Sequence, residues 1–292
     1  MAMETIIGHE KPIALIKALI KKGKVPHALL FEGPEGIGKK KVALWTIQAL
    51  NCKEAPGEGC GRCNTCERIS RLIHPDLLLL TPQGDSLGID QIRVAQQMLQ
   101  FKPLEAVWKA VILEGADRLT EEAANAFLKT LEEPPPWTLI ILLASSAESL
   151  LPTVRSRCQK IRFLPLSERE VAEVLRRMGI TDIPEEAIRM GSPGRALKLG
   201  FEEVKNYLAT ALTGDEKEVL KVAEEIGQDK EKALTFMDYL LFEVKSKAFQ
   251  SLSLRESFWK LLELKEALLE HANPRLCLES ALFELKGKLS PC

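Results

Sequence analysis

A segment with the chemistry to bind phosphate runs from Gly33 to Lys39 and reads GPEGIGK. Gly33, Gly36 and Gly38 let backbone amides curl around phosphate oxygens, and Lys39 supplies a cation for the terminal phosphates. A magnesium-dependent enzyme carries Ser or Thr at the next position, where its hydroxyl binds the metal ion, but this chain carries Lys40. A glycine turn that binds no ligand is the alternative interpretation.

A second part of the machinery for nucleotide hydrolysis is also incomplete. The apolar run 111–113 is followed by Glu114 and Gly115. An active enzyme places there one carboxylate near the metal ion and a second that orients the attacking water. Glu114 can supply the first, but Gly115 has no side chain to supply the second. Because phosphoryl transfer needs its parts assembled together, we expect the isolated chain to hydrolyse ATP only at background.

Four cysteines, Cys52, Cys60, Cys63 and Cys66, are spaced C-x7-C-x2-C-x2-C. Two-residue gaps let neighbouring thiolates face one ion, and four such ligands complete a closed tetrahedral zinc site. Since one short segment supplies all four, metal binding would fold a small module at residues 52–66. An iron–sulfur cluster uses the same ligands and is the main alternative, and a disulfide pair is a weaker one.

Two arginines lie in sequence contexts that suit phosphate recognition. Arg157 lies in a basic stretch, 153–162, within the triplet Ser-Arg-Cys, and Arg195 follows the turn sequence GSPG at 191–194. From spacing alone, we expect Arg157 to lie in a solvated loop. The alternative is that its guanidinium contacts a phosphate that is bound elsewhere. Arg195 either faces a nucleotide or covers the start of a helix.

These residues require a scaffold, and the hydrophobic pattern predicts an α/β one. Short apolar runs that read as buried parallel strands alternate with amphipathic helical segments in the first part of the chain. The predicted strands are 28–31, 77–81, 110–113, 139–145 and 160–163, and the predicted helices are 11–21, 39–50, 89–99 and 121–131. Ser167 and Glu170 form a capping box that opens a further helix to Met178. From about residue 201 the pattern is helical throughout.

Composition excludes several classes of function. Lys and Arg total 40 and Asp and Glu total 41 in 292 residues. This balance excludes a strongly basic nucleic-acid binder and disfavours a zinc-dependent nucleic-acid module. The longest apolar run, 139–144, is far shorter than the ~18 residues of a membrane-spanning helix. Seven cysteines and an N-terminus without a signal-peptide pattern favour a reducing, cytoplasmic location.

Several motifs in a fixed order resemble the bacterial clamp-loader proteins of the AAA+ class. The phosphate loop and the four-cysteine module come first. They are followed by NAFLKTLEEPP at 125–135, Ser-Arg-Cys at 156–158 and GSPGRAL at 191–197. Each motif alone is weak, but their order is specific, and the resemblance covers about residues 1–200.

The resemblance implies roles that spacing does not give. It implies that Arg157 is an arginine finger completing the ATP site of an adjacent subunit, that the four cysteines bind zinc, and that Ser145 is a sensor near the phosphates. It also implies that the chain is a stator, a subunit of the assembly that does not hydrolyse ATP. Its degenerate loop would at most bind ATP or ADP, without turnover. Residues 1–165, 166–203 and 204–292 correspond to an AAA+ P-loop domain, a helical lid and a helical collar.

The partners implied by the resemblance are those of a pentameric hetero-oligomeric loader. They are ATPase subunits and a clamp-opening delta subunit, with the sliding clamp and primer-template DNA reached through the assembly during DNA replication. No membrane partner is expected, and the chain alone is expected to lack ATPase and polymerase activity. The alternative is a self-sufficient AAA+ ATPase that uses Glu114 or Asp117 in place of the missing groups.

Overall fold

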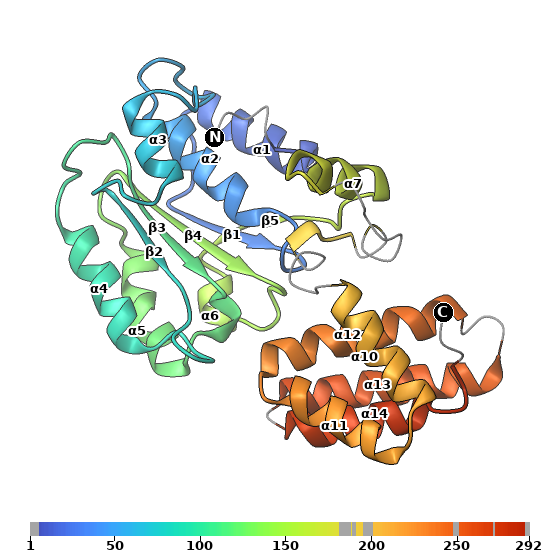
Figure 1. The fold of residues 1–292 in the computed structure, drawn as a ribbon. Coiled ribbons are helices and arrows are strands. Elements are labelled where there is room, and N and C mark those ends of the chain that lie inside the picture. The colour runs from blue at the N-terminus through green and yellow to red at the C-terminus, as the bar shows by residue number, and fades with distance from the viewer. Residues whose placement is uncertain are drawn as a thin grey trace. The chain divides into compact units, whose positions relative to one another are not determined.

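The computed structural model describes residues 6–180, 188, 191–194, 201–247, 251–270 and 272–289. The chain divides into two compact units, Met1–Gly179 and Ile180–Cys292. The first unit contains a parallel sheet with its covering helices, and the described part of the second is helical (Figure 1). Among the described helices, none is both long and apolar enough to cross a membrane.

The first unit is built on a five-stranded sheet in the order β2-β3-β4-β1-β5. Every neighbouring pair of strands is parallel, so each connection must cross over the sheet. All five strands lie within one residue of the predicted bounds. They are β1 (Ala28–Glu32), β2 (Leu77–Leu80), β3 (Lys109–Glu114), β4 (Thr138–Ala144) and β5 (Gln159–Arg162).

The central strands β1, β3 and β4 are buried on both faces, which explains why they are nearly continuous apolar runs rather than alternating ones. In β1, Leu29 and Phe31 belong to the core on one face, while Ala28 and Leu30 belong to the core on the other. The residues of β4 divide between the two cores in the same alternating way. The two-residue period of a strand therefore assigns each side chain to one of two hydrophobic layers.

Helices cover both faces of this sheet (Figure 1). Residues of α1, α2 and α3 enter the core with Leu29, and residues of α4 and α5 enter the core with Leu30. The helices of the first unit are α1 (Glu10–Lys21), α2 (Lys39–Asn51), α3 (Asn64–Ser70), α4 (Ile89–Gln100), the 3-10 turn η2 (Ala116–Arg118), α5 (Glu121–Glu132), α6 (Pro152–Arg155) and α7 (Glu168–Arg177).

A buried carboxylate fixes the loop that leads into β3. Asp76 is 1% exposed and accepts backbone N–H bonds from Leu104, Glu105 and Ala106 at 2.7 to 2.9 Å. Burial raises the pKa of Asp76, but these three bonds and the nearby Lys109 ammonium outweigh it and hold the pKa below its ordinary value. The loop is therefore tied to the residue that precedes β2.

The helix α7 begins as its sequence predicts. The Ser167 hydroxyl and the Glu170 carboxylate form the reciprocal capping box, with the Ser167 N–H donating to Glu170 Oε2 at 2.7 Å. Val171 and Leu175 form its buried face. Because the box satisfies backbone N–H groups that no helical carbonyl can reach, it fixes where the helix starts.

The second unit is a helical bundle around its own core. Its largest buried side chains include Phe236 and Tyr239 of α12, packed with Leu261 of α13 and Leu278 of α14. The helices are α10 (Phe201–Thr213), α11 (Glu216–Gly227), α12 (Lys230–Lys247), α13 (Leu252–Leu269) and α14 (Pro274–Leu285).

Candidate functional site

The phosphate loop connects the carboxyl end of β1 to the amino end of α2. Gly36 and Gly38 have φ angles of 75° and 107°, which favour glycine. Gly33 has a φ of 152°, and a Cβ at this position would overlap the carbonyl oxygen of Phe163. Steric crowding therefore requires glycine at Gly33, where the loop leaves the sheet beside the segment that follows β5.

Lys39 is nine-tenths buried at the start of α2. Its ammonium donates to the backbone carbonyl of Gly33 and, at 2.8 Å, to that of Pro34. These two bonds hold the Lys39 ammonium against the backbone of the loop. The loop residues predicted from sequence are thus brought together by β1 and α2.

The residue after Lys39 has a different partner. The Lys40 ammonium donates to Glu114 Oε2 at 2.8 Å, across 74 positions of sequence. Glu114 ends β3, and both side chains are a little over one-third exposed. An ammonium, rather than the hydroxyl of a complete motif, therefore lies beside this carboxylate. Gly115 follows with a φ of 68° and carries no group that could act as a base.

Ser145 and Asp117 form another polar contact near the same edge of the sheet. The Ser145 hydroxyl donates to Asp117 Oδ2, and the Ser145 N–H points to the same oxygen at 3.4 Å. Ser145 directly follows β4, and Asp117 lies in η2 after β3. Both carboxylates considered for a self-sufficient ATPase, Glu114 and Asp117, are therefore paired with side chains of this chain.

Sequence reasoning missed one residue beside the phosphate loop. The His9 ring Nε2 lies 2.7 Å from the backbone oxygen of Ile37, and the ring packs edge-on against Phe163 at 5.0 Å. Because Ile37 offers only a carbonyl oxygen, Nε2 must donate. His9 therefore fixes the loop from outside. Its position before α1 follows no motif, so only the folded chain reveals it.

Arg157 lies between α6 and β5, at the amino ends of the strands and so at the end of the sheet opposite to the phosphate loop. Its Nε donates to Glu132 Oε1 at 2.9 Å, Nη2 donates to the same oxygen, and Nη1 donates to Thr153 O at 2.8 Å and Ser156 Oγ at 3.1 Å. The side chain is 33% exposed. The guanidinium is thus held at the surface by a carboxylate and a local turn.

The neighbours of Arg157 explain the triplet Ser-Arg-Cys. Ser156 supplies an acceptor for the guanidinium, while Cys158 packs against the core on the α4 and α5 face. Burial raises the pKa of the Cys158 thiol to about 12, so it remains a neutral apolar group. Cys158 therefore anchors the turn from which Arg157 reaches the surface.

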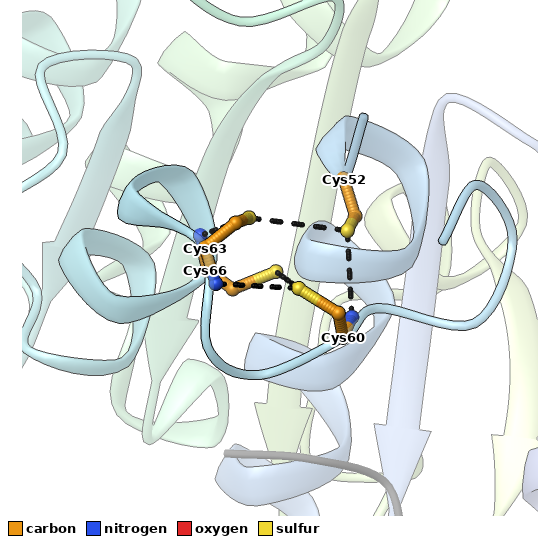
Figure 2. A group of neighbouring side chains, drawn as sticks. All are labelled: Cys52, Cys60, Cys63 and Cys66. Atoms are coloured by element: carbon orange, nitrogen blue, oxygen red, sulfur yellow. Dashed lines mark hydrogen bonds between the residues drawn. The ribbon is translucent and has the colours of Figure 1, made fainter. Parts of the chain in front are cut away.

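The four predicted cysteine ligands meet in one cluster (Figure 2). Their Sγ atoms all lie within 4.8 Å of one another, with 3.9 Å between Cys52 and Cys63 and 4.0 Å between Cys60 and Cys66. Cys52 follows α2, whereas Cys63 caps α3 and Cys66 lies in its first turn. The α3 helix was not predicted, because seven residues are too few to show a helical period.

The cluster fits a tetrahedral metal ion. Zinc–sulfur bonds of about 2.3 Å place tetrahedral sulfur atoms about 3.8 Å apart, close to the 3.9 and 4.0 Å of the Cys52–Cys63 and Cys60–Cys66 pairs. Backbone N–H groups of Ala55 and Cys60 point to Cys52 Sγ at 3.3 and 3.4 Å. Burial raises the pKa of Cys52, but these donors and the thiols of Cys60 and Cys66 together outweigh it and lower the pKa to about 7. The four cysteines can therefore hold a structural metal such as zinc.

The predicted site residues fall into three places within the first unit. The phosphate loop, Lys40 with Glu114, and Ser145 gather at the carboxyl ends of β1, β3 and β4, where open α/β sheets bind ligands. Arg157 lies at the amino ends of the strands, and the cysteine cluster lies beside α2 and α3. Arg195 lies outside the described residues, so its predicted role has no structural counterpart here.

Strand order and phosphate loop together define a class. A β2-β3-β4-β1-β5 parallel sheet with the loop after β1 is the AAA+-like P-loop fold, as predicted. A gamma subunit-related DNA polymerase III protein from Thermotoga maritima shares this fold, with a TM-score of 0.50 over 93% of this chain and 97% of that one at 18% identity.

Within this class the chain belongs to the family described as DNA polymerase III, delta subunit, whose model matches residues 8–167. It is 39% identical to the delta' subunit of Bacillus subtilis over 53% of this chain and 47% of that protein. It is 35% identical to the delta' subunit of Escherichia coli over 65% of this chain and 58% of that protein. The chain thus matches about half of the length of these relatives.

Proposed function

We propose that this chain acts as a delta'-type subunit of a bacterial DNA polymerase III clamp loader, as a stator that does not hydrolyse ATP. The family match over the sheet unit supports this assignment. The proposal covers the whole chain, with residues 166–203 as a helical lid and 204–292 as a helical collar for assembly. The cysteine cluster would hold zinc as a structural ion, with no open coordination position for chemistry.

The Lys40–Glu114 pair supports the absence of turnover. Its ammonium neutralises the carboxylate that would assist magnesium, and Gly115 supplies no base. Lys39 and the glycines of the loop remain in place, which allows ATP or ADP to bind without being hydrolysed. Ser145 would then contact the terminal phosphate as a sensor. Arg195 is proposed to face a nucleotide from the lid.

The position of Arg157 is the observation that carries the trans role. The phosphate loop follows the carboxyl end of β1, whereas Arg157 precedes the amino end of β5, which pairs with β1 in parallel. The four residues of β5 span about 13 Å along the sheet. Arg157 therefore points away from the phosphates of its own chain and suits the ATP site of a neighbouring subunit, where guanidinium groups stabilise phosphoryl transfer.

The proposed partners follow from this role. They are the ATPase subunits of a pentameric loader and its clamp-opening delta subunit, and the assembly would act on the sliding clamp and primer-template DNA in the cytoplasm. The alternative function is a self-sufficient AAA+ ATPase. The pairing of Glu114 with Lys40 and of Asp117 with Ser145 disfavours it.

Replacement of Arg157 tests the proposal directly. We expect a reconstituted loader with Arg157→Ala to lose about tenfold or more of its DNA-stimulated ATP hydrolysis and clamp loading, since an arginine finger supplies a large part of the rate. Arg155→Ala is the matched control, because Arg155 belongs to the same turn and lies 3.8 Å from Glu148 instead. Unchanged activity of the Arg157→Ala loader would refute the trans role.

A further inference from the structure

The guanidinium of Arg157 is largely engaged within its own chain. An arginine has five N–H donors. The contacts to Glu132, Thr153 and Ser156 use one N–H of Nε, both of Nη1 and one of Nη2, four in all. A two-pronged contact with phosphate needs two parallel N–H groups. The conformation described here therefore lacks the donors that such a contact requires.

We propose that Glu132 is a latch on Arg157: its carboxylate binds the guanidinium until a neighbouring subunit presents a nucleoside triphosphate. This inference rests on the proposed trans role of Arg157. Two of the four engaged donors end on one oxygen of Glu132, so this single carboxylate withholds Nε and Nη2 together. It also offsets the positive charge that would attract phosphate.

The location of Glu132 supports a role beyond helix stability. It is the last residue of α5, where the negative end of the helix dipole disfavours a carboxylate and favours cations. Lys129 in the same turn has the favourable sign. The charge of Glu132 is thus unfavourable at this end of α5, and its two bonds to Arg157 offset the unfavourable interaction with the helix dipole.

The exposure of the pair allows it to open. The Glu132 side chain is 49% exposed and that of Arg157 is 33% exposed, so solvent weakens their attraction. A triphosphate in a protein-enclosed site carries more charge and offers two oxygens at once, so it competes successfully for the guanidinium. With such a latch, the apparent affinity of Arg157 for its target equals the intrinsic affinity multiplied by the fraction of molecules in which the pair is open.

Glu132→Gln tests the latch by removing the charge while retaining an acceptor. Wild-type and variant chains are titrated into the remaining loader subunits with ATP and primed DNA, and ATP hydrolysis is followed. We expect the concentration of chain that gives half-maximal hydrolysis to fall about two- to fivefold, with the maximal rate unchanged. Glu132→Ala is expected to act in the same direction, and thermal melting of each variant confirms that it is folded.

Two comparisons separate the latch from other effects. Glu133→Gln makes the same charge change at the next residue, and we expect it to leave the half-maximal concentration unchanged. In the Arg157→Ala background, Glu132→Gln is expected to have no effect, because the latch acts only through Arg157. If Arg157→Ala itself left activation intact, the proposed function would fail. If Arg157→Ala lowered the maximal rate as expected but Glu132→Gln did not lower the half-maximal concentration, the latch alone would fail.

Discussion

The ammonium of Lys40 and the carboxylate of Glu114 lie 2.8 Å apart and join the phosphate loop to the end of β3. In a magnesium-dependent enzyme a hydroxyl and a metal ion connect these two positions. Here the ammonium of Lys40 binds the carboxylate directly. The loop keeps its glycines and Lys39, while the hydroxyl after Lys39 and a base after Glu114 are missing.

The purified chain should therefore turn over ATP at the same background rate as its Lys39→Ala variant. Lys40→Thr should also remain at background, because Gly115 still supplies no base for the attacking water. Release of phosphate from radiolabelled ATP measures all three proteins. A wild-type rate well above background that disappears in Lys39→Ala would show a self-sufficient ATPase instead.

The cysteine cluster should contain one zinc ion per chain. Because a metal ion joined to four thiolates holds the 52–66 segment together, Cys66→Ser should lower the zinc content far below one and expose the segment to protease. Elemental analysis of purified protein measures zinc and iron together. Cys277→Ser, which changes a buried thiol of the second unit, is the matched control and should keep its metal. Iron in place of zinc would indicate a cluster of another type.

Removal of the Asp76 carboxylate should destabilise the first unit by about 3 to 5 kcal/mol. Asp76→Ala leaves three backbone N–H groups without their acceptor and leaves the buried Lys109 without its nearby counter-charge. Urea unfolding followed by tryptophan fluorescence measures the free energy, since Trp45, Trp108 and Trp137 all lie in this unit.

Asp76→Asn provides the comparison for this prediction. It retains one oxygen acceptor and should lose less stability than Asp76→Ala. Equal stability of Asp76→Ala and the wild type would show that the 101–108 loop is fixed by other contacts.

The stability of the second unit should depend on pH through Glu284. Hydrogen bonds from Lys260 and Lys288 lower the pKa of this carboxyl to about 2, with a further bond from Ser257. Because the folded-state pKa lies below the unfolded value of about 4.3, the stabilisation is complete above that value and is lost as the pH falls towards 2.

Glu284→Gln should therefore destabilise the protein by about 2 kcal/mol at pH 7 and by progressively less below pH 4. Thermal unfolding followed by circular dichroism over a pH series measures the difference from the wild type. Glu263→Gln alters an exposed carboxyl of α13 and should show little difference at any pH. A Glu284→Gln deficit that stayed constant down to pH 2 would contradict the mechanism.

Much of the sheet unit could be predicted because its signals are local. Apolar runs of four to seven residues gave β1 to β4 to within one residue, and the Ser167–Glu170 capping box gave the start of α7. The four cysteines were predicted as a cluster because two-residue gaps constrain thiolates to one point, and the structure confirms that they meet. By contrast, α3 is too short to show a period, and His9 belongs to no motif.

The sequence by itself determined which chemical parts are present and which are missing: the glycines and Lys39 of the loop, a lysine at position 40, glycine at 115 and four closely spaced thiols. Only the tertiary structure decided which of these charged groups meet. Lys40 contacts a carboxylate 74 residues away, and Arg157 contacts one 25 residues away, with β4 and α6 between the two residues in the chain. Such pairings depend on strand order and helix placement, which result from packing across the whole sheet rather than from any local pattern.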